Sequence, residues 1–228
     1  MKISKGAQAI ALILLVLLVD QIVKIQIKTT MTIGESITVF GNWFFIKFIE
    51  NPGMAFGLDI PGRLGKPILT IFRIIAVIAI GWYLRELVKS RVNTGLILCV
   101  ALIFAGAMGN IIDSVFYGLI FNDSTFYTVA KMFPPEGGYG TLLHGRVVDM
   151  LYFPIIKGSY PGWFPFWAGE EFIFFRPIFN IADSSISAGI IAILLFQKRF
   201  FHENKPIVEV GSREEEVGSR EEGVGSRK

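Results

Sequence analysis

The sequence predicts an integral membrane protein that is mainly α-helical, with four transmembrane helices and short strands outside the membrane. Two observations carry this prediction. Of the 228 residues, 52% are hydrophobic and 18% are charged, with a mean hydropathy of +0.55, and soluble domains carry more charge than this. In addition, four apolar stretches each have about the 20 residues that a helix needs to cross a bilayer.

The expected spans belong to one membrane domain over residues 1–200, at about 7–28, 67–87, 94–117 and 177–198. Flanks rich in Lys and Arg precede the first span, separate the second from the third and follow the fourth. Because such flanks stay in the cytoplasm, we expect both termini inside and segments 29–66 and 118–176 outside. Residues 201–228 repeat Val-Gly-Ser-Arg between Glu runs, which predicts a disordered cytoplasmic tail.

Composition and missing motifs exclude several classes of protein. The net charge of +3 is spread over membrane flanks and the tail, so we expect no nucleic-acid partner. The only histidines are His144 and His202, and neither H-E-x-x-H nor G-x-S-x-G occurs. We therefore expect no metal and no cofactor. Carboxylates in unusual places remain as the candidates for chemistry.

The two outer segments differ in character. Residues 37–58 are rich in β-branched and aromatic side chains and are broken by Asn51-Pro-Gly53, a pattern typical of short strands joined by a turn. The second segment, 118–176, is long and aromatic. Aromatic side chains with polar tips suit the headgroup layer, so we expect this segment on the membrane surface. Ordinary packing among loop residues would give a similar pattern.

Two pairs of polar residues lie within apolar spans. Asp20 and Lys24 are four residues apart and share one helix face. They form either an ion pair near the headgroups, with the lysine extended outward, or a structural pair beside an active site. Asn110 and Asp113 lie on the face that carries the small side chains of the third span, where another helix can approach closely. We expect these two residues to tie the helices together.

Two further acids lie at the ends of elements. Asn180 and Asp183 have the spacing of an N-cap and its capping box at the start of the fourth span. Asp149 interrupts the apolar, strand-like run Val147–Phe153, and either a solvated edge position or pairing with nearby Arg146 would explain it. Asp149 gains functional meaning if it meets Asp183. Two such carboxyls in a poorly hydrated site share one proton, so that one activates water while the other donates a proton.

Five short motifs occur in a defined order along the chain. They are Asp20-Gln-Ile-Val-Lys24, Asn51-Pro-Gly53-Met-Ala55-Phe56, Gly106-Ala-Met-Gly109-Asn110-Ile-Ile-Asp113, Val147-Val-Asp149 and Phe179-Asn180-Ile-Ala-Asp183. In this order, over about residues 10–200, the sequence resembles the bacterial lipoprotein signal peptidases, or type II signal peptidases.

The resemblance implies an aspartyl peptidase of the bacterial inner membrane, with its active site at the outer face and an outer segment that forms a small extracytoplasmic β-cradle on the membrane surface. Its substrates are prolipoproteins, cut just before a cysteine that carries diacylglyceryl; membrane lipid is the other partner, and no obligate protein partner is implied. The catalytic dyad corresponds to Asp149 and Asp183. Residues that shape the site or hold the substrate correspond to Asp20, Lys24, Asn51, Gly53, Ala55, Asn110, Asp113, Arg146 and Asn180.

Two features depart from the family pattern. The family usually has Arg after the third-motif aspartate, where this chain has Ser114, which leaves Arg146 as a candidate substitute. The stretches from Asp113 to Asp149 and from Asp149 to Asp183 are also longer than is common in the family, so substrate entry can differ.

Two other functions compete with a peptidase. A small ion-coupled transporter would relay protons or cations through intramembrane carboxylates, but it predicts acids near mid-membrane and repeated halves. Here the acids lie toward the outer ends of the spans, and no halves repeat. A structural membrane scaffold would leave Asp149 unexplained.

Overall fold

The computed structural model describes residues 3–52, 65–90, 92–163, 165–167 and 169–202. Three long helices, α1 (Lys5–Thr30), α2 (Gly65–Lys89) and α3 (Thr94–Ile120), contain 26, 25 and 27 residues. Each is long and apolar enough to cross a membrane. The shorter apolar helix α4 (Ile181–Leu195) is followed after Phe196 by α5 (Gln197–His202). The chain is thus a mainly helical membrane protein.

The first three helices contain the predicted spans, but the fourth begins later than predicted. Residues Ile178–Phe179 form strand β6 and pair with another strand, and Asn180 then caps α4. The predicted start at residue 177 is therefore too early. The apolar pattern could not locate this boundary, because a strand and a helix with similar composition follow each other directly.

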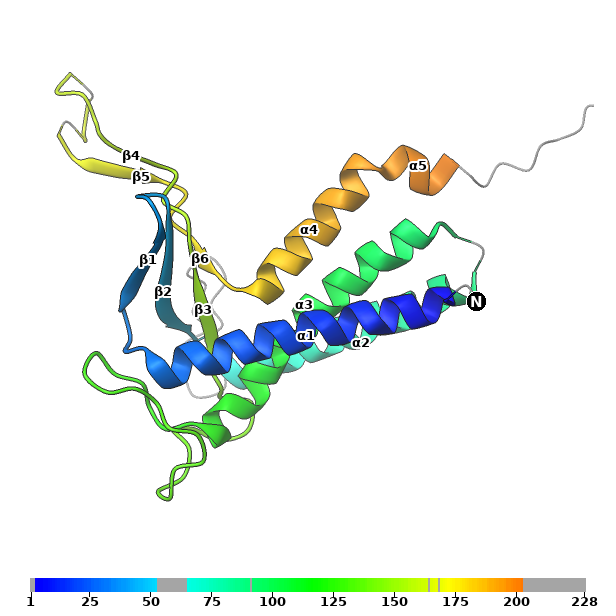
Figure 1. Cartoon of the computed structure of the whole chain (residues 1–228), viewed down its shortest axis with the longest axis horizontal. Helices are drawn as coiled ribbons and strands as arrows, with labels where there is room; N and C mark the ends of the chain where they lie inside the picture. The colour runs from blue at the N-terminus through cyan, green and yellow to red at the C-terminus, as the bar shows by residue number, and fades with distance from the viewer. Residues whose placement is uncertain (1–2, 53–64, 91, 164, 168, 203–228) are drawn as a thin grey trace, which may run out of the picture.

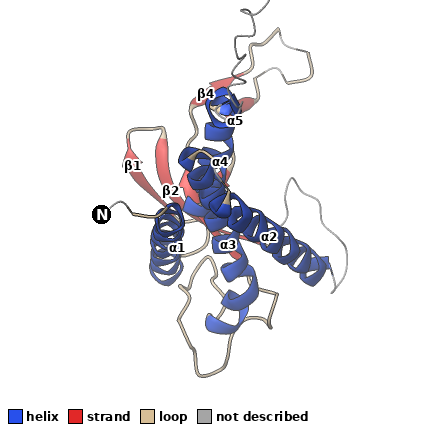
Figure 2. Ribbon diagram, turned by 90° about the vertical axis from the view of Figure 1, so that its right-hand side faces the viewer, coloured by secondary structure: helices blue, strands red, loops and turns tan. Residues whose placement is uncertain are grey.

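Helix α3 lies at the centre of the helices, with contacts to α1, α2 and α4 (Figure 2). Glycine allows the closest of these contacts. A Cβ on Gly106 would lie 2.2 Å from the carbonyl oxygen of Ala182, and a Cβ on Gly189 would lie 2.6 Å from that of Cys99. The prediction that small residues on this span let another helix approach is therefore confirmed.

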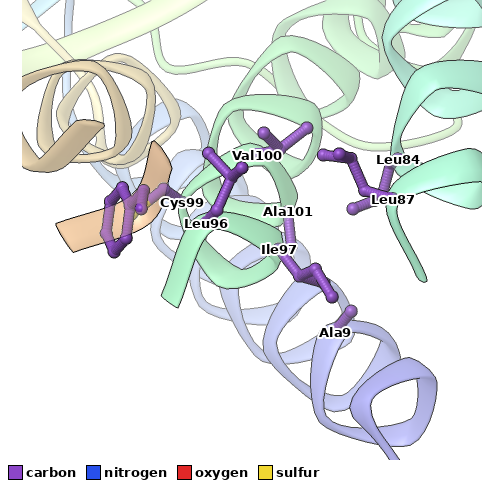
Figure 3. Close-up of a cluster of buried hydrophobic side chains, with 9 residues drawn as sticks. Ala9, Leu84, Leu87, Leu96, Ile97, Cys99, Val100 and Ala101 are labelled. Atoms are coloured by element: carbon purple, nitrogen blue, oxygen red, sulfur yellow. The ribbon is translucent and has the colours of Figure 1, made fainter. Parts of the chain in front are cut away.

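Apolar packing joins α1, α2 and α3 at the end of the helices near the N-terminus (Figure 3). The labelled cluster contains buried residues of all three helices: Ala9, Leu84, Leu87, Leu96, Ile97, Cys99, Val100 and Ala101. Large apolar side chains also face outward, such as the row Leu14, Leu18 and Ile22 on α1, each more than half exposed. Such outward rows suit contact with lipid tails rather than water.

A four-stranded antiparallel sheet lies across the opposite end of the helices (Figure 1). Its order is β1-β2-β3-β6, formed by β1 (Ser36–Phe40), β2 (Phe44–Asn51), β3 (Val147–Tyr152) and β6. The prediction of strands in residues 37–58 is confirmed up to Asn51, with the turn between β1 and β2 at residues 41–43. The predicted turn at Asn51-Pro-Gly53 and the remainder of the segment extend beyond the described residues. In β3, all four residues from Val147 to Met150 are buried, because this strand lies inside the sheet and against α1 and α3.

The two long connections form structures of their own. Residues between β3 and β6 make a second antiparallel sheet of β4 (Ile156–Ser159) and β5 (Glu171–Phe174), which projects away from the helices (Figure 1). The loop after α3 is closed by a bridge between Phe121 and Met132. Aromatic side chains of both connections are open to the surroundings, with Tyr127 and Phe166 each 92% exposed. Their placement on the membrane surface stays a prediction.

Candidate active site

Asp149 is held inside the sheet with both carboxylate oxygens bonded. It lies on β3 opposite Ile49 of β2 and is 4% exposed. The amide nitrogen of Asn51 donates to its Oδ2 at 3.2 Å, and that of Asn180 donates to its Oδ1 at 2.8 Å. Burial and then the negative charge of Asp183 raise the pKa of Asp149 to about 7, against the opposing effect of these hydrogen bonds.

Asp183 lies in the first turn of α4, where it completes the predicted capping box. Its backbone N–H donates to the side chain of Asn180 at 2.9 Å, and its Oδ2 accepts from the Asn180 backbone N–H at 3.3 Å. The other oxygen, Oδ1, accepts a 2.7 Å hydrogen bond from Asn110 on α3. Capping uses one oxygen of Asp183 and leaves the other directed toward α3, so capping and chemistry are compatible.

Asn180 connects the two aspartates. Its side-chain nitrogen bonds Asp149, and its side-chain oxygen accepts from the backbone of Asp183. The residue is fully buried. A buried amide that uses both its donors and its acceptor fixes its neighbours. Asp149 from the sheet and Asp183 from α4 are thereby oriented by the same side chain.

A buried ionic cluster lies behind this pair. Lys24 is fully buried and forms ion pairs of 2.9 Å with both Asp20 and Asp113, and its third hydrogen bond, also 2.9 Å, goes to Asn110. Asp20 and Lys24 thus form the predicted ion pair, but the expectation that the lysine extends outward is wrong, because its side chain is fully buried. The pair takes the other predicted role, a structural one beside the candidate site.

The acids of this cluster reach the elements that carry the candidate dyad. Asp20 accepts a 2.9 Å hydrogen bond from the backbone N–H of Ala182 on α4, and Asp113 accepts one of 3.3 Å from that of Val148 on β3. Ala182 directly precedes Asp183 in the chain, and Val148 directly precedes Asp149. The cluster therefore holds the backbone next to each aspartate of the candidate dyad. The expected role of Asn110 and Asp113 in tying the helices together is confirmed.

Arg146 lies in a separate polar cluster. Its guanidinium pairs with Glu50 at 2.9 Å and with Asp123 at 2.7 Å, so the alternative that Asp149 pairs with Arg146 does not hold. Glu50 also pairs with the buried Lys28. Burial alone would raise the pKa of Glu50, but the charges and hydrogen bonds of Lys28 and Arg146 lower it. This cluster anchors the end of β2, next to Asn51.

A pocket of about 340 Å³ opens beside the two aspartates. Its polar lining residues are Asn51, Arg73, Asn110, Asp149 and Asp183. The remaining lining residues are apolar and come from α2, α3, α4 and the start of β3: Ala76, Val77, Ile80, Ala107, Ile111, Val147 and Ile186. An apolar pocket with a few convergent polar groups is the usual form of a small-molecule or substrate site.

The structure thus brings most of the predicted residues together and adds one. Asn51, Asn110, Asp149 and Asp183 line the pocket, while the other described candidates except Arg146 hold these four in place. Gly53 and Ala55 lie outside the described residues. Arg73 was missed by sequence reasoning, although a single arginine inside an apolar span is itself a signal. Within the described ranges, no three His, Cys, Asp or Glu side chains group as metal ligands would.

Comparison with known proteins identifies the family. A family model described as "Signal peptidase (SPase) II" matches residues 12–199. A lipoprotein signal peptidase of Porphyromonas gingivalis is 50% identical over 199 residues, covering 87% of this chain and 86% of that protein. A lipoprotein signal peptidase of Amoebophilus asiaticus is 36% identical over 189 residues, covering 82% of this chain and 75% of that protein.

Two solved structures described as bacterial membrane enzymes share the fold. One has a TM-score of 0.55 and 29% identity, covering 83% of this chain and 92% of that one. The other has a TM-score of 0.57 and 27% identity, covering 92% of this chain and 94% of that one. The chain therefore belongs to the signal peptidase II family and is an integral membrane peptidase that removes signal peptides from lipoproteins.

Proposed function

We propose that this protein cuts prolipoproteins immediately before a cysteine that carries diacylglyceryl, using Asp149 and Asp183 as an aspartic dyad. One observation carries the proposal: two carboxyls from different elements line one pocket, and the pKa of Asp149 is raised to about 7. A raised pKa keeps a proton on the pair near neutral pH. The pair then holds both an acid and a base at the same time.

General acid-base hydrolysis follows from this arrangement. The ionised carboxylate accepts a proton from water as the water oxygen attacks the carbonyl carbon of the scissile bond. The protonated carboxyl donates its proton to the carbonyl oxygen, which gives a neutral tetrahedral intermediate. On collapse the amide nitrogen takes a proton from one carboxyl of the dyad and leaves, while one hydroxyl of the intermediate gives its proton to the other carboxylate. Because the two groups titrate as one coupled pair, either aspartate can start as the base.

The neighbouring amides keep the dyad oriented. Asn180 and Asn51 bond Asp149, and Asn110 bonds Asp183. Each is an amide, so it restricts the position of a carboxylate without adding a charge. The buried Lys24 cluster supports Asn110 from behind. Such support places acidic groups within the narrow tolerance that proton transfer requires.

The proposed substrate suits the walls of the pocket. A diacylglyceryl group keeps its cysteine at the membrane, so the scissile bond must reach the dyad from the bilayer. The pocket wall formed by α2 and α4 is apolar apart from Arg73 and Asp183. We therefore propose lateral entry between these helices, with the active site at the outer face of the membrane and both termini in the cytoplasm.

The buried ionic cluster argues against the alternative that this protein is an ion-coupled transporter. Its relay would use Asp20, Lys24, Asp113 and Asp183, but the first three of these pair with one another in a fully buried cluster, and Asp183 alone lines the pocket. Charges that satisfy each other in this way are a structural element rather than a series of exchangeable sites.

The test is cleavage of defined substrates by the purified protein in detergent. A diacylglyceryl-modified prolipoprotein is compared with the same protein lacking the lipid and with a variant that has Ser at the cysteine position. Mass spectrometry of the products should show a single cut before the cysteine, with the lipidated substrate alone. Equal cutting of all three substrates, or no cutting of the lipidated one, would refute the proposal.

A further inference from the structure

We propose that Arg73 is a catalytic residue of this site, which donates hydrogen bonds to the carbonyl oxygen of the scissile peptide bond as negative charge develops there. The inference rests on the proposed function and adds a residue to it. It starts from the face of α2 on which Arg73 lies.

Arg73 belongs to the face of α2 that turns toward the pocket. Arg73, Ala76, Val77 and Ile80 follow one another at steps of i, i+3, i+4 and i+7, and all four line the pocket. This spacing puts them on a single helix face. The exposed side chains Phe72, Ile75 and Ile78 occupy other positions of the same turns and are 68%, 61% and 66% exposed. Arg73 is therefore directed away from the lipid and toward the aspartates.

The guanidinium lies within electrostatic reach of both members of the dyad, first Asp183 and then Asp149. Among the pocket-lining residues in the described part of the chain, Arg73 is the one cation, and it faces two acids. A dyad that shares one proton carries a net charge of −1, which a single guanidinium balances. This balance matters because a pocket with apolar walls solvates charge poorly.

The other nearby cations are engaged elsewhere. Lys24 has three donors, and Asp20, Asp113 and Asn110 accept from it at 2.9 Å each. Arg146 pairs with Glu50 and Asp123 and does not line the pocket. Arg146 is therefore not favoured as the residue that takes over the role of the arginine usual in the family at position 114. Ser114 itself donates to the backbone carbonyl of Asn110 at 2.9 Å and supplies no charge.

The chemistry of peptide hydrolysis gives a cation in this place a defined task. When water attacks, electron density moves onto the carbonyl oxygen before the proton of the dyad is fully transferred to it, and fixed N–H donors aimed at that oxygen lower the barrier. A guanidinium has five donors in a rigid fork, so it can hold a protein partner and a substrate oxygen together. Arg73 forms and breaks no covalent bond, and the proton transfers remain with the dyad.

The experiment compares Arg73→Gln and Arg73→Lys with Arg85→Gln. Arg85 is the matched control, because it lies on the same helix, is 69% exposed in its side chain and does not line the pocket. Cleavage of the lipidated prolipoprotein gives kcat and KM for each protein. An infrared titration follows the carboxyl of Asp149, assigned by its loss in Asp149→Asn.

We expect Arg73→Gln to lower kcat/KM by about 100-fold, the usual effect of losing one donor to a developing oxyanion, with most of the loss in kcat. Arg73→Lys keeps the positive charge but lacks the planar set of guanidinium donors, so kcat/KM in this variant should fall by only about tenfold. The pKa of Asp149 should rise in Arg73→Gln, because a nearby cation is gone, and stay unchanged in Arg85→Gln. Wild-type kcat/KM in Arg73→Gln, or a loss matched by lower thermal stability with no change in that pKa, would overturn the inference.

The two proposals fail in different ways. If the wild-type protein cuts the lipidated substrate and Arg73→Gln cuts equally well, the proposed function stands and the role of Arg73 is wrong. If the wild-type protein is inert, the proposed function fails. In that case an unchanged pKa of Asp149 in Arg73→Gln overturns the inference as well, while a raised pKa supports the placement of Arg73 beside the dyad.

Discussion

Replacing Asp149 by Asn should make the protein more stable at alkaline pH while it removes a group proposed to be catalytic. The ordinary pKa of an aspartate is 3.8, and that of Asp149 in the folded protein is raised to about 7. Between these values the folded protein keeps a proton that the unfolded chain has released. By proton linkage, stability then falls as pH rises from about 4 to about 7 and is level above that. The amide in the Asp149→Asn variant has no such proton to lose.

The size of the effect follows from the shift. A change of about 3 pKa units corresponds to at most about 4 kcal/mol, at 1.36 kcal/mol per unit. Asp149 is almost wholly buried, so solvent screens little of this amount. For soluble domains of similar length, 1 kcal/mol moves Tm by about 2 to 4 °C, so the rise expected at pH 8.5 has an upper limit of about 8 to 16 °C. At pH 4 the two Tm values should nearly coincide, because Asp149 is neutral in the folded protein and this pH lies close to the ordinary aspartate pKa of 3.8.

The assay is thermal unfolding of Asp149→Asn and wild type in the same detergent, from pH 4 to pH 8.5. The difference in Tm should grow with pH and reach its limit just above pH 7. A difference that is constant across this range, or that grows as pH falls, would show that Asp149 is not a buried group with a raised pKa.

Two further substitutions test how the site is supported. Lys24→Met should lower the free energy of unfolding by about 3 to 5 kcal/mol, because it leaves Asp20 and Asp113 buried without a cation; an unchanged unfolding midpoint in denaturant at neutral pH would contradict the buried cluster. Gly106→Ala places a Cβ 2.2 Å from the carbonyl oxygen of Ala182, so α4 must shift together with Asp183, the aspartate that we propose to be catalytic. Cleavage should fall at least tenfold while circular dichroism keeps its helical signal, and full activity would show that this helix contact is not critical.

The helices and their caps could be predicted from the sequence because they depend on local patterns. Apolar runs long enough to span a bilayer gave α1, α2 and α3, and the spacing of Asn180 and Asp183 gave the capping box at the start of α4. The start of that helix was misplaced because two residues of β6 precede it. Strand pairing with a distant segment leaves no local signal in an apolar run.

Most residues of the candidate site could be predicted from the sequence, but few of the contacts between their side chains could be. Asp149 and Asp183 lie 34 residues apart in the sequence, and only the resemblance joined them before the structure brought both to one pocket. Arg73 carries no motif, and its orientation depends on how α2 packs against α3. The pairing of Arg146 with Glu50 and Asp123 likewise joins three distant segments. Contacts of this kind are set by tertiary packing, which periodicity does not report.

The most direct test of the central claim is cleavage of a diacylglyceryl-modified prolipoprotein by wild type, Asp149→Asn and Asp183→Asn, with Asp123→Asn as the control. Asn keeps the shape of the side chain and removes its ionisable group. Asp123 is an exposed acid that lies outside the pocket and pairs with Arg146. If the dyad performs acid-base catalysis, each of the first two variants remains folded and loses cleavage by several orders of magnitude, while Asp123→Asn cuts like wild type. If either Asp149→Asn or Asp183→Asn cuts at the wild-type rate, the aspartic dyad is not the catalytic group.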